Sequence, residues 1–135
     1  MNDVQVRNDI QVFASYAAAF EVAFLNDDWK LVRECFDEDA VYDVVAGPPF
    51  GGTWQGRDAI VEHFVESVNS FDRKYDDRQL EALAGPEMRG DAVYIRWAVT
   101  YRKAGQPDLR VEGEEEAWVK DGRIVRLKDT MPGGA

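Results

Sequence analysis

The stretch that decides the fold is LRVEGEEEAWVKDGRIVRLKDT, residues 109–130. Its two parts, 109–120 and 123–130, alternate apolar and charged residues, which predicts two half-buried strands. Asp121-Gly122 between them is a strong signal for a β-hairpin turn. Two earlier segments extend the predicted sheet, a long strand in 88–103 and a weaker strand in 74–85 that ends at Gly85-Pro86.

Alternation along these strands predicts which side chains share a face. One face of the strand in 88–103 carries Val93, Ile95, Trp97, Val99 and Tyr101. In the hairpin, Glu115 aligns with apolar neighbours such as Val111 and Ala117, and Asp129 aligns with Leu127. We therefore expect Glu115 and Asp129 to point toward the face that helices cover, whereas Glu114 and Glu116 point away.

Two carboxyl groups on a covered face need an explanation, because burying a charged carboxylate is costly unless it is neutralised or hydrogen-bonded. One interpretation is that Glu115 and Asp129 are acid/base groups of a pocket. The other is that Tyr, Trp, Arg or backbone donors satisfy them, or that Asp129 is solvated at the end of its strand.

The first half of the chain predicts helices. A stripe at steps of three and four predicts a helix over 8–26, capped by Asn8 or Asp9; its members are Ile10, Phe13, Ala17, Phe20 and Phe24. Asp27-Asp28 breaks this helix, a short helix with a buried Cys35 follows over about 28–36, and a third is predicted over about 57–71. Helices followed by strands indicate an α+β fold with helices on one face of a curved antiparallel sheet.

The segment AVYDVVAGPPFGGTWQ, residues 40–55, predicts a strand over 40–46 and then a loop. Tyr42 faces the side opposite to Asp43, where it either holds a substrate oxygen or only packs. We expect Phe50 or Trp54 to close over the mouth of the pocket. His63, on the third helix, is the only histidine; it is either an acid/base group or an ordinary core residue.

The composition of the chain disfavours several classes of partner and of functional site. The net charge of −10 and the pI near 4.5 disfavour nucleic-acid and anionic membrane partners. One His and one Cys are too few for a zinc site, and the chain lacks GxGxxG, P-loop and GxSxG motifs. We expect no cofactor and no metal, a cytoplasmic location, and one domain over 1–135 with a core at 8–130 and a tail at 131–135.

Three segments carry a family resemblance: LNDDWKLVRECFDEDAVYD (25–43), GRDAIVEHF (56–64) and AWVKDGRIVRLKD (117–129). Over about 8–130 the chain resembles the SnoaL-like branch of the nuclear transport factor two-like superfamily, with its ketosteroid isomerases, limonene epoxide hydrolases and polyketide cyclases. The resemblance implies a cone-shaped, mostly antiparallel sheet around a long N-terminal helix, with about three helices and a central apolar pocket. It also implies a homodimer through the outer sheet face, at Tyr94, Arg96, Thr100 and Trp118.

The resemblance implies that only some of the catalytic residues of these enzymes are present in this chain. The isomerase tyrosine, aspartate and acid fall on Phe20, Val44 and Glu115. Of the epoxide hydrolase set, Tyr42 matches the tyrosine and Asp129 matches one aspartate, while Val44, Trp97 and Val99 replace the asparagine, the arginine and the other aspartate. Polyketide cyclases of this branch use a pocket aspartate as acid/base, and Asp129 or Glu115 could serve in that role here.

These observations favour a cofactor-free enzyme with carboxylate acid/base chemistry of the isomerase, cyclase, hydratase or hydrolase type. Its ligand is a small, mostly apolar molecule. The candidate catalytic residues are Asp129, Glu115, His63 and Tyr42, and the candidate substrate-binding residues are Phe20, Val44, Phe64, Trp97, Val99 and Tyr101. The alternatives are a non-catalytic binding protein for a hydrophobic ligand and a dimeric accessory or scaffold protein with a vestigial pocket.

Overall fold

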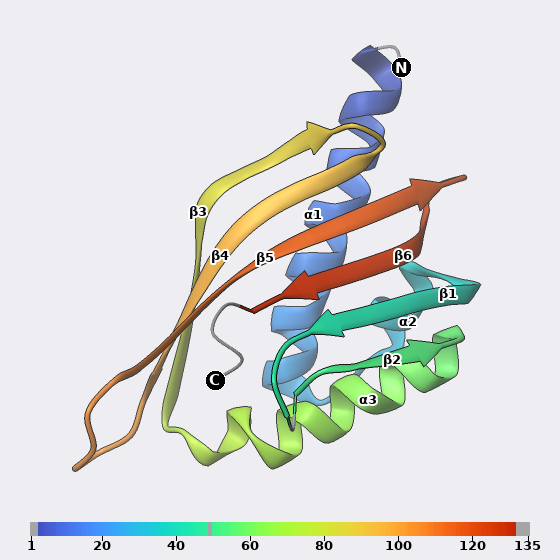
Figure 1. Cartoon of the computed structure of the whole chain (residues 1–135). Coiled ribbons are helices and arrows are strands. Elements are labelled where there is room, and N and C mark those ends of the chain that lie inside the picture. Colours follow the sequence, from blue (N-terminus) through green and yellow to red (C-terminus); the bar gives the residue numbers. More distant parts are fainter. Residues whose placement is uncertain (1–2, 49, 132–135) are drawn as a thin grey trace.

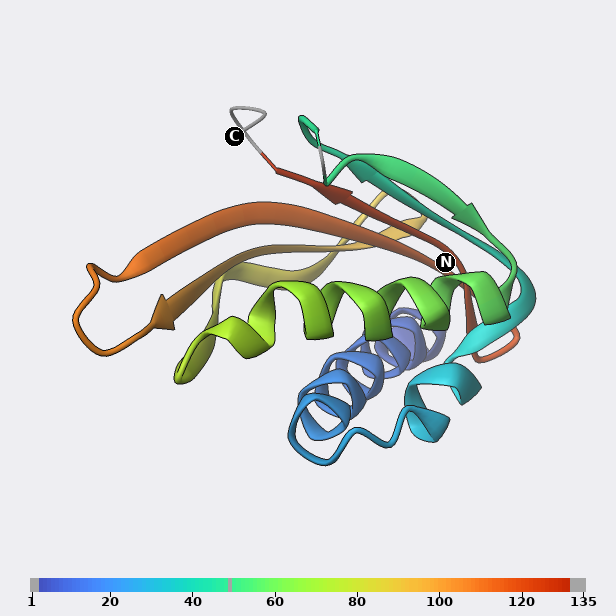
Figure 2. The same cartoon turned by 90° about the horizontal axis from the view of Figure 1, so that it is seen from below.

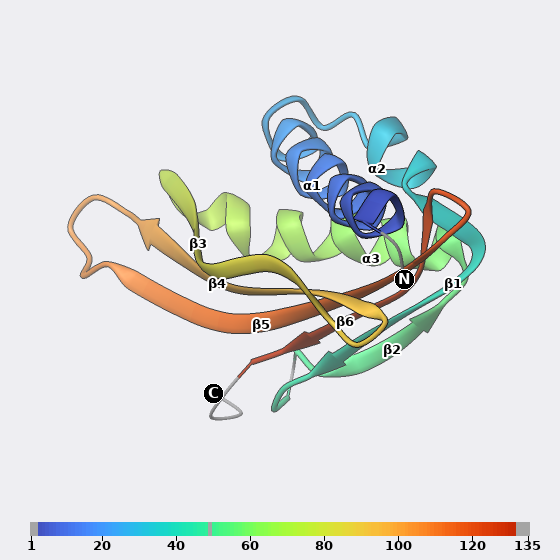
Figure 3. The ribbon, with the colours of Figure 1, turned by 90° about the horizontal axis from the view of Figure 1, so that it is seen from above.

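The fold is built on a curved, open sheet, and the helices lie on its concave face (Figures 1, 2 and 3). The computed structural model describes residues 3–48 and 50–131, with side chains from residue 8 onward. The elements in chain order are α1 (Asp3–Asn26), α2 (Lys30–Glu34), β1 (Phe36–Val45), β2 (Gly52–Gln55), α3 (Arg57–Ser70), the 3-10 turn η1 (Asp72–Lys74), β3 (Asp77–Arg89), β4 (Ala92–Arg102), β5 (Leu109–Lys120) and β6 (Arg123–Thr130).

In the described part of the chain, six strands form one sheet in the order β2-β1-β6-β5-β4-β3. Neighbouring strands are antiparallel except β1 and β6, which pair in parallel. The predicted α+β fold with a mostly antiparallel curved sheet is therefore confirmed. The parallel pair lies inside the sheet, with β2 on one side and β5, β4 and β3 on the other, and it joins the first strand of the chain to the last.

The β5–β6 hairpin follows the prediction from sequence. Its strands have the expected bounds, and the turn residues Asp121 and Gly122 have φ values of 54° and 79°. Positive φ at both turn residues matches the right-handed twist of the flanking strands. The hairpin register makes Glu115 the direct partner of Asp129, so the two side chains lie on the same face.

The first helix is longer than predicted. It begins at Asp3 instead of residue 8, because the segment before Asp9 contains no helix-breaking Gly or Pro. Asn8 and Asp9 are therefore inside the helix and not at its cap, and Asp9 is buried. The second helix is shorter than predicted, and Cys35, expected to be buried, is half-buried at its end.

Three strand boundaries also differ from prediction. β1 begins at Phe36, four residues earlier than expected, and the expected loop contains the short strand β2, whose Trp54 pairs with Tyr42. β3 runs from Asp77 through Gly85-Pro86 to Arg89, so β4 begins at Ala92 and not at residue 88 as predicted. Because β3 is an edge strand, the missing N–H of Pro86 need not cost a ladder hydrogen bond.

An aromatic cluster fills the space between α1, α3 and β1. Phe64 is at its centre, with ring centroids of Tyr16, Phe20, Phe36 and Tyr42 at 5.2–6.3 Å. Phe36, Ile60, Ile124 and Leu127 are fully buried around it. This packing anchors α1 and α3 on the sheet. Among the described residues, no helix combines the length and apolar character needed to cross a membrane.

Candidate functional site

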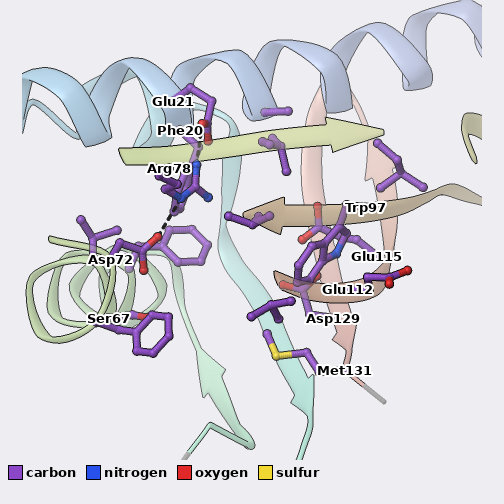
Figure 4. Close-up of a pocket in the computed structure, with 18 of the residues that line it drawn as sticks. Phe20, Glu21, Ser67, Asp72, Arg78, Trp97, Glu112, Glu115, Asp129 and Met131 are labelled. Carbon is purple, nitrogen blue, oxygen red and sulfur yellow. Dashed lines mark hydrogen bonds and ion pairs between the residues drawn. The ribbon is translucent and has the colours of Figure 1, made fainter. Parts of the chain in front are cut away.

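A cavity of about 770 Å³ lies between helices α1 and α3 and the concave face of β3, β4 and β5. Most of its wall is apolar, with Phe13 and Phe20 from α1, Phe64 from α3, and Val99 from β4. Exposed lining residues from three segments, Phe50, Leu80 and Leu109, mark the side on which it meets solvent. Two groups of largely covered polar side chains interrupt the apolar wall (Figure 4), and the partly exposed ion pairs of Arg110 with Glu81 and Glu112 also line the cavity.

The first polar group contains the carboxyl pair Glu115–Asp129. Burial raises the pKa of Glu115 well above its usual value, and the charge of Asp129 adds to the rise. Burial also raises the pKa of Asp129, while the polar hydrogens of Glu115, Tyr42 and Trp97 near its carboxyl group oppose the rise; of these, Tyr42 makes a hydrogen bond. Two carboxyl groups this close in an apolar wall cannot both ionise at low cost. Burial therefore favours a proton on the pair, and Glu115, whose pKa is raised more strongly, is the stronger proton holder.

Tyr42 from β1 orients this pair. Its hydroxyl donates a hydrogen bond of 2.5 Å to Oδ2 of Asp129. Burial raises the pKa of Tyr42 well above its usual value, and the charge of Asp129 adds to this, so the phenol stays protonated. Within residues 3–48 and 50–131, the buried Oδ1 of Asp129 has no hydrogen-bonding partner of normal geometry. That oxygen is available to a proton held on Glu115 or to a donor on a ligand.

Tyr16 also lines the cavity and was missed by the reading of the sequence. Burial raises the pKa of its phenol well above the usual value, with further contributions from the charges of Glu115 and Asp129. Tyr16 precedes Phe20 by four residues, so both lie on one face of α1. The steps from Phe13 to Tyr16 and on to Phe20 fit the helical stripe equally well, and that signal could have found it.

His63 lines the cavity beside the first polar group. Its ring stacks on the indole of Trp54, with 3.6 Å between centroids and 17° between planes. Burial lowers the pKa of His63 below its usual value, although the charge of Glu66 acts in the opposite direction. The imidazole is therefore neutral at pH 7 and offers one donor and one acceptor.

The second polar group joins three elements around Arg78 of β3. Its Nη1 donates to Glu21 of α1 at 2.5 Å, and its Nε donates to Asp72 of η1 at 2.8 Å. The hydroxyl of Tyr101 donates to the same Asp72 oxygen at 3.1 Å. The guanidinium and the Asp72 carboxylate are almost completely buried. We call these four residues the Arg78 cluster; only Tyr101 was a candidate from the sequence.

The structure brings the predicted site residues together at one cavity, with one exception. The lining set includes Asp129, Glu115, His63, Tyr42, Phe20, Phe64, Trp97, Val99 and Tyr101. Val44 is buried in the core and does not line the cavity. Phe50 lines it and packs edge-on against Phe71, whereas Trp54 packs behind His63 and Tyr42.

Among the described residues, no group of three or more His, Cys, Asp or Glu side chains is arranged to hold a metal ion. The acidic run Asp37–Asp39 lies in β1, with Glu38 and Asp39 exposed. The polar atoms that face the cavity are carboxyl, phenol, imidazole, indole and guanidinium groups. They can exchange protons and hydrogen bonds with a ligand.

The chain is similar to a known family in sequence and to solved structures in fold. Residues 16–127 match the family model described as "SnoaL-like domain". Similar solved structures include Bal32a from a soil-derived mobile gene cassette, with 20% identity over 93% of each chain and a TM-score of 0.70. An NTF2-like protein from Anabaena variabilis has 16% identity over 93% of this chain and 90% of its own, with a TM-score of 0.73.

A third similar structure is an LEH-like epoxide hydrolase from M. tuberculosis. It has 17% identity over 94% of this chain and 84% of its own, with a TM-score of 0.63. At such identities these structures show a shared fold. No curated protein is significantly similar to this chain in sequence.

Proposed function

Because the chain belongs to the family of SnoaL-like domains, we propose that it is a cofactor-free enzyme that moves protons on a small, mostly apolar substrate. The observation that carries this proposal is the carboxyl pair Glu115–Asp129, which lines an apolar cavity with one buried oxygen of Asp129 left without a partner among the described residues. Carboxyl groups with raised pKa values exchange protons readily near neutral pH.

The two carboxyl groups take different roles. Tyr42 donates to Asp129 and favours its ionised form, so Asp129 is the base. Glu115 keeps the proton of the pair, so it is the acid. Asp129 removes a proton from the carbon next to a carbonyl, the C–H electron pair forms a C=C bond, and the carbonyl oxygen takes the proton of Glu115. The pair still holds one proton after this step, and the reverse transfer at another carbon completes an isomerisation.

The neighbouring side chains support this exchange. His63 and Tyr16 line the same cavity and offer hydrogen bonds to an oxygen of the substrate. Trp97, Phe20 and Phe64 provide apolar contacts and reduce the access of water to the reacting atoms. Cyclisation, hydration and hydrolysis use the same transfer of one proton to and from the pair.

The test is uptake of deuterium from heavy water by a panel of uncharged cyclic ketones, followed by NMR. We expect the parent protein to label the carbon beside the carbonyl of at least one ketone. Glu115→Gln and Asp129→Asn should each lower the rate by about 100-fold or more. The matched control is Glu114→Gln, whose side chain hydrogen-bonds Tyr94 instead of lining the cavity.

Exchange at the parental rate in both variants would show that the pair is not the acid/base. The second candidate is a non-catalytic binding protein, and the mostly apolar wall favours it. In that case the parent protein would bind a ketone without labelling it. A scaffold with a vestigial pocket is less well supported, because Trp97, Tyr101 and Phe64 line an open cavity instead of filling it.

A further inference from the structure

The charge of the Arg78 cluster indicates which class of ligand the cavity can bind. We propose that the cavity takes an elongated, uncharged ligand with a hydrogen-bonding group at each end, and that it rejects the matching carboxylate. The inference deepens the proposed function and rests on it in one respect, because one end of the ligand is placed at Glu115–Asp129.

A single buried arginine in an apolar cavity would ordinarily indicate a carboxylate ligand, since the guanidinium fork matches a carboxylate. Here two carboxylates of the chain already occupy that fork. Glu21 accepts from Nη1 and Asp72 accepts from Nε, at 2.5 and 2.8 Å. One cation and two anions leave the cluster with a net charge of −1. A third carboxylate would have to displace an existing ion pair.

The guanidinium cannot easily turn away from these partners. It lies over the ring of Phe24 at 5.4 Å and near the ring of Phe20 at 5.8 Å from the centroid. Tyr101 fixes Asp72 from the other side through its hydroxyl. These contacts hold the charges of the cluster in place, so a ligand meets a preformed site.

The other end of the cavity carries the carboxyl groups of Glu115 and Asp129, and Oδ1 of Asp129 has no hydrogen-bonding partner among the described residues. Figure 4 shows the two polar groups set apart, with the Arg78 cluster beside α1 and α3 and the carboxyl pair near Trp97. Apolar side chains such as Phe20 and Val99 line the space with them. The negative charge of the Arg78 cluster, with acidic groups at the other end, opposes an anionic ligand, and the apolar wall strengthens this repulsion.

An uncharged hydroxyl suits the Arg78 cluster. In the described part of the chain, Nη2 of Arg78 and Oδ1 of Asp72 take part in none of the hydrogen bonds of the cluster. The proposed ligand hydroxyl accepts a hydrogen bond from Nη2 and donates one to Oδ1. An ammonium group on the ligand would be attracted by the negative charge of the cluster. It would, however, lose its strong hydration and compete with Arg78 for the same carboxylates.

The experiment uses three probes that differ only at one end: 4′-(hydroxymethyl)biphenyl-4-ol, 4′-hydroxybiphenyl-4-carboxylic acid and 4′-(aminomethyl)biphenyl-4-ol. Binding to the full chain is measured by isothermal titration calorimetry at pH 7.5. We expect the alcohol to bind at least about tenfold more tightly than the acid and more tightly than the amine. The proposal is overturned if the acid binds as well as the alcohol, if the amine binds best, or if none of the three binds.

Charge-changing variants test whether the charge of the Arg78 cluster causes the preference for the alcohol over the acid. Glu21→Gln with Asp72→Asn keeps the shape of the cluster and changes its net charge from −1 to +1, so affinity for the acid should rise at least about tenfold relative to the alcohol. Glu38→Gln with Asp91→Asn removes two exposed negative charges elsewhere and should leave the ratio unchanged. If the double variant does not fold, Glu21→Gln alone, at a partly exposed site, should shift the ratio in the same direction.

An unchanged ratio in the cluster variants would overturn the inference. The two proposals fail separately, because this test measures binding and not turnover. If the alcohol is preferred but the carboxyl-pair variants keep their exchange rate, only the proposed function fails. If those variants lose exchange but the acid binds as well as the alcohol, only the inference about charge fails.

Discussion

At the scale of single residues, the carboxyl pair shows a balance between two physical effects. Burial favours protonated carboxyl groups, whereas the hydrogen bond from Tyr42 favours an ionised Asp129. Because the donor acts on only one member of the pair, the two groups differ in proton affinity. That asymmetry separates an acid from a base within one small site.

Removal of the Tyr42 hydroxyl tests this asymmetry. Tyr42→Phe leaves a buried carboxylate without its donor, so we expect the free energy of unfolding at pH 7 to fall by about 1–3 kcal/mol. The pKa of Asp129 should rise further, because the lost hydrogen bond favoured the ionised form. Urea unfolding measures the first effect. Tyr75→Phe is the control, and an equal loss in both variants would contradict the role of the hydrogen bond.

The raised pKa of Glu115 predicts how stability depends on pH. The pKa in the folded state lies above the unfolded value of about 4.3. The contribution of this group is therefore complete below the unfolded pKa and is lost as the pH rises through the folded pKa. Glu115→Gln mimics the protonated form, so the variant should exceed the parent in stability at pH 8, and the difference should shrink toward pH 4.

This prediction is checked by urea unfolding at several pH values between 4 and 8, with Glu114→Gln as the control on the exposed neighbour. A difference between Glu115→Gln and the parent that does not change with pH would show that the carboxyl group of Glu115 ionises as it does in the unfolded chain.

At the scale of elements, the packing of β4 against β5 positions the indole of Trp97. Gly113 is the direct partner of Trp97 in the sheet. A Cβ at Gly113 would lie 2.5 Å from Cζ2 of Trp97 and 3.0 Å from the carbonyl oxygen of Thr130. A glycine at this position therefore lets the indole cross β5 and reach the carboxyl pair.

Gly113→Ala should displace the indole. We expect a loss of about 1–3 kcal/mol in the free energy of unfolding from the steric conflict and a changed tryptophan emission spectrum. The matched background is Trp97→Phe, in which the same substitution should cost less because the atoms nearest to the new methyl group are absent. Equal costs in the two backgrounds would show that Gly113 is needed for another reason.

At the scale of the whole molecule, the convex sheet face carries exposed ion pairs. Arg96 pairs with Glu112 at 3.2 Å, and Arg126 pairs with Asp43 at 2.9 Å while lying 5.2 Å from the ring of Trp118. We propose that two copies of the chain associate through this face, with Arg96, Thr100 and Trp118 at the contact. Tyr94, also expected there, is mostly covered by Arg89 within one protomer.

Trp118→Glu should weaken this association by placing a charge at the centre of the contact. Sedimentation velocity at micromolar concentration should show a dimer for the parent and a monomer for the variant. Val22→Glu adds the same charge on α1 and should remain a dimer. A monomeric parent, or a variant that stays dimeric, would contradict the proposed interface.

The sequence pattern alone was sufficient to predict the features that depend on residues close to one another in the chain. The β5–β6 hairpin followed from alternation and from Asp121-Gly122, and alternation placed Glu115 and Asp129 on one face. The helical stripe placed α1 on the sheet, although its first residue was not predicted. These features are local, because the period of a strand or helix sets the direction of each side chain.

Only the tertiary structure decided which distant groups meet. Tyr42 reaches Asp129 across 87 residues because β1 pairs in parallel with β6. The Arg78 cluster assembles from α1, η1, β3 and β4, and none of its ion pairs is visible from spacing in the sequence. Periodicity specifies the face that a side chain occupies. Its partner on that face depends on strand order and on helix packing, which are set by the burial of the whole core.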